Sequence, residues 1–224
     1  MFMGSFTGKK IFSALFSVFL VVILSCATVA CSQVVPDIVQ ADYSVVFDYK
    51  DAENLPSSRL CVFVASESDV RRYSAIRLVS KETGLIWETG DILKLQESDR
   101  QWSGNANFVP PEKEVIPSGV YEVTFINADE EEDSLEFKVK YNEAYYETLS
   151  VDVPELMKKQ NGINKIAIYD ADGKMLYFGN RNADLLSVRG IWNNYREAEI
   201  FQDIWCSADL SVMCIMPEEA VSLE

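Results

Sequence analysis

The chain has 224 residues, 48% of them apolar, with 35 Asp and Glu against 20 Lys and Arg. This length and composition suffice for a sizeable core in one or two domains and exclude an intrinsically disordered chain. There is no histidine, which excludes Ser-His and Cys-His catalysis and histidine metal sites. Lys9 and Lys10 are the only charged residues among the first 31, so the remainder carries 18 basic and 35 acidic groups. That net charge of −17 repels phosphate backbones, and we expect no nucleic-acid partner.

The N-terminal segment has the organisation of an export signal. Lys9 and Lys10 precede residues 11–30, which carry no charge and only three serines and one threonine as polar side chains. Secretory signals require such a basic start followed by an apolar stretch and small residues. An uncleaved run of this length would just span a bilayer, so a single-pass anchor is an alternative.

The end of this apolar run carries a recognisable cysteine motif. An aliphatic residue lies three positions before a cysteine, and a small residue directly before it, in Ile23-Leu24-Ser25-Cys26. The segment resembles the lipobox of bacterial lipoproteins. The resemblance implies a signal peptide over residues 1–25 and membrane attachment through a lipid on Cys26. Cys31 is the alternative attachment site, and Thr28-x-Ala30 would also permit ordinary cleavage without a lipid.

The other cysteines and the acidic runs bear on cross-links and metals. In an oxidising envelope thiols can pair, and Cys206 and Cys214 are the nearest pair, so they are our candidate disulfide. Zinc-type ligand spacing is absent from the sequence. We interpret Asp129–Asp133 and Asp170–Gly173 as turns, because neither has the ligand order of an EF-hand. We therefore expect no metal and no cofactor.

The chain from Asp42 onward has the period-two pattern of strands. Alternating apolar positions predict a strand at 43–50, a continuous apolar run predicts a central strand at 60–65, and the paired segments 75–80 and 85–88 predict a hairpin. A further strand is expected at 92–96. The clearest hairpin joins 121–125 to 135–141 through the acidic run. Several short strands over about a hundred residues predict a mainly β fold, with a β-sandwich.

One segment resembles a known family. Pro117-Ser118-Gly119-Val120-Tyr121 is similar to the entry of strand F in immunoglobulin-like and fibronectin-type domains. The resemblance covers residues 42–141 and implies that the Tyr121 hydroxyl bonds back to the preceding corner. Val123 stands where antibody domains have their second cysteine, so Cys61 has no cross-sheet partner. The resemblance is therefore to bacterial Ig-like modules without the disulfide, which act in adhesion, as spacers or as accessory domains.

Beyond residue 141 we expect a smaller, β-rich or α+β region. A strand is predicted at 149–153, a hairpin at 165–169 and 175–178, one or two helices between 185 and 201, and a strand at 211–216. The predicted organisation is a signal peptide (1–25), a tether (26–41), the Ig-like sandwich (42–141) and a C-terminal region (142–224). The C-terminal region either folds alone or completes the sandwich domain.

Neither a catalytic motif nor a phosphate-binding glycine pattern occurs in the sequence. Trp102 lies in Gln101–Asn105, a segment of loop composition, and is our candidate for partner contact. The leading hypothesis is a lipid-anchored, exported envelope protein, on the periplasmic face or the cell surface, that is not an enzyme and binds a protein or glycan partner. The alternatives are a carbohydrate-active or accessory enzyme using acidic residues, and an assembly factor for a membrane complex.

Overall fold

The computed structural model of the protein describes residues 36–67, 73–97, 100–112 and 114–223. The predicted export signal and both candidate lipid-attachment sites, Cys26 and Cys31, lie outside the described residues. The described residues belong to one compact unit, Val35–Glu224. Within this described part, none of the helices has the length and apolarity needed to cross a membrane.

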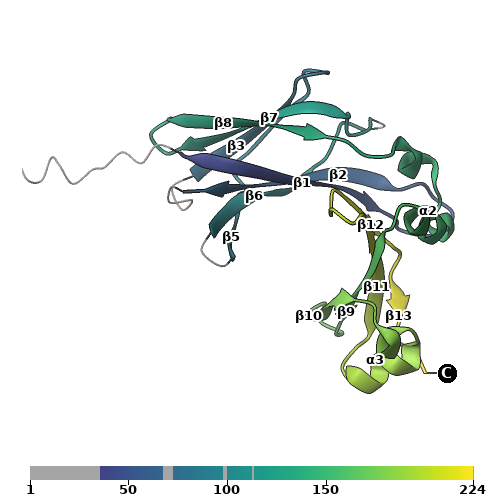
Figure 1. Cartoon of the computed structure of the whole chain (residues 1–224). Coiled ribbons are helices and arrows are strands. Elements are labelled where there is room, and N and C mark those ends of the chain that lie inside the picture. Colours follow the sequence, from purple (N-terminus) through teal and green to yellow (C-terminus); the bar gives the residue numbers. More distant parts are fainter. Residues whose placement is uncertain (1–35, 68–72, 98–99, 113, 224) are drawn as a thin grey trace, which may run out of the picture. The chain divides into compact units, whose positions relative to one another are not determined.

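The chain is mainly β, as the sequence predicts, and the described strands form two sheets (Figure 1). Sheet A has nine strands in the order β10-β9-β11-β12-β1-β2-β6-β5, with β13 beside β11. Its strands are β1 (Ile38–Asp48), β2 (Ser57–Ser66), β5 (Leu93–Glu97), β6 (Arg100–Phe108), β9 (Ile163–Tyr169), β10 (Met175–Asn180), β11 (Ile200–Cys206), β12 (Val212–Ile215) and β13 (Glu219–Ala220). Sheet B has the order β4-β3-β7-β8, formed by β3 (Tyr73–Ser80), β4 (Ile86–Thr89), β7 (Gly119–Asn127) and β8 (Glu132–Val139).

The period-two pattern of β1 and β2 explains how the two sheets share one core. Val45 and Phe47 of β1 are fully buried, and so are Leu60 and Val62 of β2. They belong to one apolar cluster with residues of sheet B such as Phe125. Burial of these faces is the main force that holds the two layers together. The predicted central strand is confirmed, because β2 pairs with β1 on one side and with β6 on the other.

The predicted hairpins are confirmed at their turns. Gly84 between β3 and β4 has a φ of 70°, and Gly173 between β9 and β10 has a φ of 75°, which glycine adopts without a steric penalty. The acidic run is a turn between β7 and β8, where Asn127 Oδ1 accepts hydrogen bonds from the backbone N–H groups of Asp129 and Glu131. Asx side chains commonly stabilise turns in this way.

Tyr121 makes the contact that its sequence context predicts. It is fully buried at the start of β7, and its hydroxyl donates a 2.8 Å hydrogen bond to the carbonyl oxygen of Pro117. The phenol therefore ties β7 to the corner that precedes it. Trp87 of β4 stacks on Tyr121 with ring centroids 6.4 Å apart, which extends the aromatic packing of sheet B.

The predicted strand at 149–153 is wrong. This segment contains η3 (Ser150–Asp152) and the start of the helix α2 (Val153–Lys159), after another short turn of helix, η2 (Glu143–Glu147). Pro154 is the reason: we interpreted it as a strand terminator, but it occupies the first turn of α2, where its missing N–H costs nothing. Lys158 and Lys159 in the last turn favour the same helix.

The prediction of one or two helices between 185 and 201 is confirmed with one helix, whereas the loop predicted at Gln101–Asn105 is wrong. Between 185 and 201 the chain forms η4 (Ala183–Leu185) and a single longer helix, α3 (Val188–Asn194), and then enters β11. The spacing that suggested a second helix arises because Ala198 and Phe201 pack with Ile191 in one small core. The predicted loop at Gln101–Asn105 is part of β6, because pairing with β2 and β5 on both sides overrides its loop composition.

The C-terminal region belongs to the same compact unit as the other described residues and joins sheet A through β12. Strand β12 pairs in parallel with β1, from Val45 opposite Val212 to Asp48 opposite Ile215. Cys214 of β12 belongs to the same core as residues of β1, β2 and β7. At the other end, β1 begins at Ile38, so residues 38–41 of the predicted tether form part of sheet A.

Candidate functional site

The face of sheet A that points away from sheet B, here called the outer face, carries half-exposed apolar side chains. Because neighbouring residues of a strand point to opposite faces, burial of Val62 and Val64 in the shared core places Phe63 on the outer face. Phe63 pairs with Gly104 of β6, which in turn pairs with Leu93 of β5. Leu93 is 45% exposed.

Gly104 allows the Phe63 ring to lie low across the sheet. A Cβ atom at this position would come within 2.0 Å of the carbonyl oxygen of Val62 and 2.9 Å of Cγ of Phe63. The neighbouring row of the same face consists of Ala65, Trp102 and Leu95. The missing side chain therefore allows β6 to pack closely against β2 at Phe63.

Two pockets adjoin this face, the first of them reaching around the edge of β1, and share Asp42 and Phe63; together we call them the Phe63 groove. The first has a volume of about 490 Å³ and the second of about 410 Å³. The groove is lined by Ala41, Asp42, Tyr43, Ser44, Cys61, Phe63, Leu95, Gln96, Trp102, Asp209, Leu210, Ser211 and Met213. Volumes of this size accommodate several side chains of a partner or a small ligand.

The first pocket lies where β12 stops covering β1. The backbone N–H of Val45 donates to the carbonyl oxygen of Ser211 at 2.8 Å, and pairing with β12 begins there. The N–H and C=O groups of one strand residue point to the same side and alternate along the strand. The corresponding groups of Ala41 and Tyr43 therefore point to the same edge as those of Val45. Among the described residues, no strand pairs with β1 at that edge before Val45.

The turn before β12 forms one wall of this pocket. Leu210 has a φ of 61°, a left-handed conformation that is uncommon for leucine. Its carbonyl oxygen accepts a 2.6 Å hydrogen bond from Ser44 Oγ, and Asp209 Oδ1 accepts bonds from the N–H and hydroxyl of Ser211. These contacts hold the strained turn against β1, and Leu210 is 42% exposed there.

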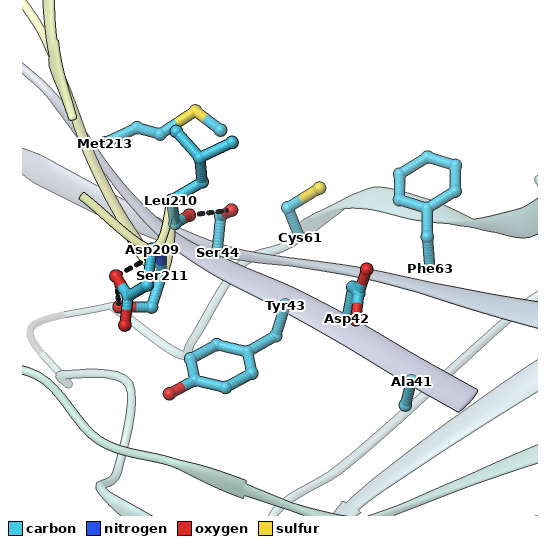
Figure 2. A pocket seen from close by; sticks show the side chains of 10 residues that line it. All are labelled: Ala41, Asp42, Tyr43, Ser44, Cys61, Phe63, Asp209, Leu210, Ser211 and Met213. Carbon is cyan, nitrogen blue, oxygen red and sulfur yellow. Dashed lines mark hydrogen bonds between the residues drawn. The ribbon is translucent and has the colours of Figure 1, made fainter. Parts of the chain in front are cut away.

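Figure 2 shows how the side chains of the first pocket divide around β1. Cys61, Phe63 and Met213 lie on one side of the β1 ribbon, and the Tyr43 ring lies on the other. The Tyr43 hydroxyl is fixed, because it accepts a 3.0 Å hydrogen bond from the backbone N–H of Lys140. The edge of β1 between these two sets of side chains is the open part of the site.

The polar side chains of the groove give it a negative character. Asp42 is exposed on β1, and Asp209 lies in the turn before β12. Hydrogen bonds from Ser207 and Ser211 hold the pKa of Asp209 below its ordinary value, so this carboxylate is ionised at neutral pH. The residues that line the two pockets include no Lys or Arg. A cationic group on a partner would therefore meet two carboxylates and no basic residue in the lining of the groove.

Trp102, the predicted partner-contact residue, does line the groove, but on a strand. It pairs with Ala65 on one side and with Leu95 on the other, and its side chain is half-buried. Its indole therefore forms part of a flat sheet face between apolar neighbours. The role of Trp102 as a contact stays a prediction.

The predicted disulfide between Cys206 and Cys214 is absent, and both residues are free thiols. Cys214 pairs with Trp205, and Cys206 pairs with Met213, so the two cysteines lie diagonally on β11 and β12. Diagonal neighbours of this kind point to opposite faces of a sheet, and the two cysteines accordingly belong to different apolar clusters. Sequence separation suggested the pair, but the register of β11 on β12 prevents it.

Cys61 is the cysteine that faces the groove. Burial raises the pKa of its thiol, with Arg59 opposing the shift, and burial raises the pKa of Cys206 and Cys214 too. All three therefore stay protonated at neutral pH, which keeps them weakly reactive. In the described part of the chain, no group of three or more Cys, Asp or Glu residues is arranged to bind a metal ion.

Sequence reasoning missed most of the groove. Phe63 lies in the continuous apolar run that predicts the central strand at 60–65, and such a run does not reveal which alternate residues face solvent. Leu210 and Met213 come from a segment that is more than a hundred residues away in sequence. The alternation of Leu93 and Leu95 around Lys94 was the one local signal of an exposed apolar strand face.

Comparison of the chain with protein-family models, with curated proteins and with solved structures found no match. The grounds for proposing a function are therefore the geometry of the groove and the sequence of the chain.

Proposed function

We propose that this protein is an exported, lipid-anchored binding module of the bacterial envelope that binds a partner protein through the Phe63 groove. The observation that carries the proposal is the groove itself, in which Phe63, Trp102 and Leu95 line one face of sheet A beside two carboxylates. Contiguous exposed apolar side chains on a soluble surface mark sites of interaction. Half-exposed aromatic residues supply the largest contact area in such sites.

The strand order supports the Ig-like part of the sequence prediction. The strand orders β1-β2-β6-β5 and β4-β3-β7-β8 correspond to A-B-E-D and C′-C-F-G of an immunoglobulin-like sandwich. Tyr121 at the start of β7, the strand equivalent to F, bonds back to Pro117 as the tyrosine corner of such domains does. We propose that the sandwich is Ig-like, with β12 added to it beside β1.

The composition of the groove favours a protein over a glycan. Leucine, methionine and phenylalanine side chains complement the apolar side chains of a protein surface. A sugar site needs several directed polar groups around an aromatic face, and the second pocket offers only Asp42 and Gln96 beside Trp102. A glycan ligand and a carbohydrate-active enzyme stay as predictions from the sequence.

The anchoring part of the proposal rests on the lipobox-like sequence before Cys26. The intact mass of the protein extracted from its native membrane tests it, with Cys26→Ser and Cys31→Ser variants for comparison. We expect an acylated N-terminus at Cys26 that the first variant loses and the second retains. An unmodified start after Ala30, or retention of residues 1–25, would contradict lipid anchoring.

The binding part is tested by site-directed photo-crosslinking in cells that make the protein naturally. A photoreactive residue replaces Leu95, which is 55% exposed in the groove, or Ile86, which is 60% exposed on β4 of sheet B. We expect one discrete protein adduct from position 95 and none from position 86. Equal adducts from both positions, or an adduct only to cell-wall glycan from position 95, would contradict the proposal.

A further inference from the structure

Within the residues that the structure describes, strand β1 has an unpaired stretch of edge beside the groove, where β12 no longer pairs with it. Strand β1 is eleven residues long, but β12 pairs with only Val45–Asp48. Backbone groups alternate in direction along a strand, and the N–H of Val45 points to the side of β12. The N–H and C=O groups of Ala41 and Tyr43 therefore point to that same side, where β1 is uncovered. We call these four backbone groups the open edge. Open edges of this kind are templates for pairing with another extended chain.

We propose that the open edge of β1 receives an extended, positively charged segment of a partner protein, which adds to sheet A in line with β12. This inference rests on the proposed function and specifies how the partner binds. Backbone hydrogen bonds to Ala41 and Tyr43 would supply affinity without regard to sequence, and pockets for alternate side chains would supply specificity.

The surroundings of the open edge fit an added strand on both of its faces. On the outer face, a side chain of the added strand would enter the pocket formed by Cys61, Phe63 and Met213. On the other face, the preceding and following residues of the added strand would contact the Tyr43 ring (Figure 2). The backbone N–H of Lys140 holds this ring in place through its hydroxyl. A strand places successive side chains on opposite faces, as this arrangement requires.

The charge of the pocket identifies the kind of segment. Asp42 and Asp209 are the two ionisable carboxylates that line the first pocket, and none of its lining residues is basic. Lysine or arginine residues that flank the apolar side chain on the outer face would lie near these carboxylates. The net charge of −15 of the whole chain adds long-range attraction for a cationic segment.

The test uses a synthetic peptide and the full chain in detergent. The probe is the acetylated, amidated peptide Thr-Lys-Thr-Val-Thr-Lys-Thr, which places valine between two lysines on one face, and its counterpart replaces both lysines with glutamate. We expect the cationic probe to bind at least about tenfold more tightly than the anionic one. Asp42→Asn should remove most of this preference, and Asp129→Asn in the β7–β8 turn should leave it unchanged.

Ala41→Pro tests the edge itself. The substitution removes the Ala41 N–H, which points away from β2. Proline is tolerated where the N–H of a strand residue is unpaired, so we expect the fold to be retained and probe binding to be abolished. N-methylated probes test the same hydrogen bonds without altering the protein. Methylation at valine and methylation at the adjacent threonine block opposite edges of the probe, so one form should lose binding and the other should keep it.

Equal affinity of the two N-methylated probes, or full binding by folded Ala41→Pro, would overturn the inference. A concentration-dependent dimer of the protein that Ala41→Pro abolishes would also overturn it, because the occupant would then be a second copy. If the adduct from position 95 forms but Ala41→Pro leaves it unchanged, strand addition fails while the proposed function stands. If position 95 gives no protein adduct, the proposed function itself fails.

Discussion

At the scale of single residues, the close packing of β6 on β2 depends on a side chain that is absent. Gly104 lies opposite Phe63, and a Cβ atom there would meet the backbone of Val62 and Phe63 at distances shorter than real contacts allow. We predict that Gly104→Ala lowers the free energy of unfolding by more than about 2 kcal/mol, because backbone atoms of β2 must move. Urea denaturation followed by circular dichroism measures the change.

Gly84→Ala is the control for that measurement. The position has a φ of 70° but open space around it, so the substitution should cost about 1 kcal/mol from backbone strain alone. A cost for Gly104→Ala no larger than this would contradict the close packing of β6 on β2.

The cysteines give a second prediction at this scale. Cys61 is half-buried in the groove, whereas Cys206 and Cys214 are buried on either face of β11 and β12. N-ethylmaleimide should therefore modify Cys61 before the other two in the folded protein, as mass spectrometry of digested peptides can follow. Modification of Cys206 or Cys214 at the rate of Cys61 would contradict the packing of the β11–β12 hairpin.

At the scale of elements, sequence reasoning succeeded where local chemistry decides the structure. The strands of the two sheets follow from alternation, as in Tyr43–Phe47 of β1, and their turns follow from residues such as Gly84 and Gly173. The Tyr121 contact with Pro117 followed from a five-residue resemblance, since both partners lie in the same corner. These features need no information from distant parts of the chain.

Sequence reasoning failed where partners distant in the chain decide. The segment around Trp102 has loop composition but is a strand, because β2 and β5 flank it. Cys206 and Cys214 are close in sequence, but the register of their strands separates them. The open edge of β1 depends on where β12 stops, and β12 comes from the far end of the chain. None of these outcomes can be read from a local window.

The β9–β11 part of sheet A contains a buried ion pair that allows a test of element stability. Arg181 Nη1 donates to Asp203 Oδ2, and their side chains are only 14% and 17% exposed. Burial raises the pKa of Asp203, and Arg181 opposes that shift. We predict that Arg181→Leu lowers the free energy of unfolding by about 3 kcal/mol, because it leaves Asp203 buried without its counter-ion.

The matched control for this ion pair lies on sheet B. Arg77 Nε donates to Glu88 Oε2 at 2.7 Å across β3 and β4, and both side chains are substantially exposed. Arg77→Leu should cost less than about 1 kcal/mol, because solvent screens the exposed pair. Equal losses for the two variants in urea denaturation would contradict the difference in burial.

At the scale of the whole molecule, the shared core makes stability sensitive to alkaline pH. Burial, with a smaller contribution from Cys214, raises the pKa of Tyr145 from 10.0 to about 12, and burial raises the pKa of Tyr49 and Tyr141 as well. The unfolded chain therefore ionises these phenols at a lower pH than the folded one. The contribution of Tyr145 is complete below pH 10.0 and is lost as the pH rises through about 12, and Tyr49 and Tyr141 add to the loss in the same direction.

We therefore predict that the free energy of unfolding, measured in urea, falls steadily above pH 10.0. In Tyr145→Phe the decline should be shallower, because one of the shifted groups is missing. A free energy of unfolding that stays constant from about pH 9 to 12 would show that these phenols have ordinary pKa values.

Among the described residues, the two sheets share one core, and β1, the first strand, is covered by another strand along only part of one edge. Strand β12 joins the C-terminal region to β1, stops at Val45, and leaves the open edge beside the apolar side chains of the Phe63 groove. Both the proposed binding surface and the proposed mode of binding depend on this incomplete cover.

Amide hydrogen exchange along β1, measured by NMR on the protein alone, tests that arrangement most directly. The N–H groups of Asp42 and Ser44 face β2, and those of Ala41 and Tyr43 face the open edge. We predict that Ala41 and Tyr43 exchange at least about a hundredfold faster than Asp42 and Ser44. Comparable protection at all four positions would mean that β1 is covered along its whole length, and would contradict both the open edge and the strand addition proposed for it.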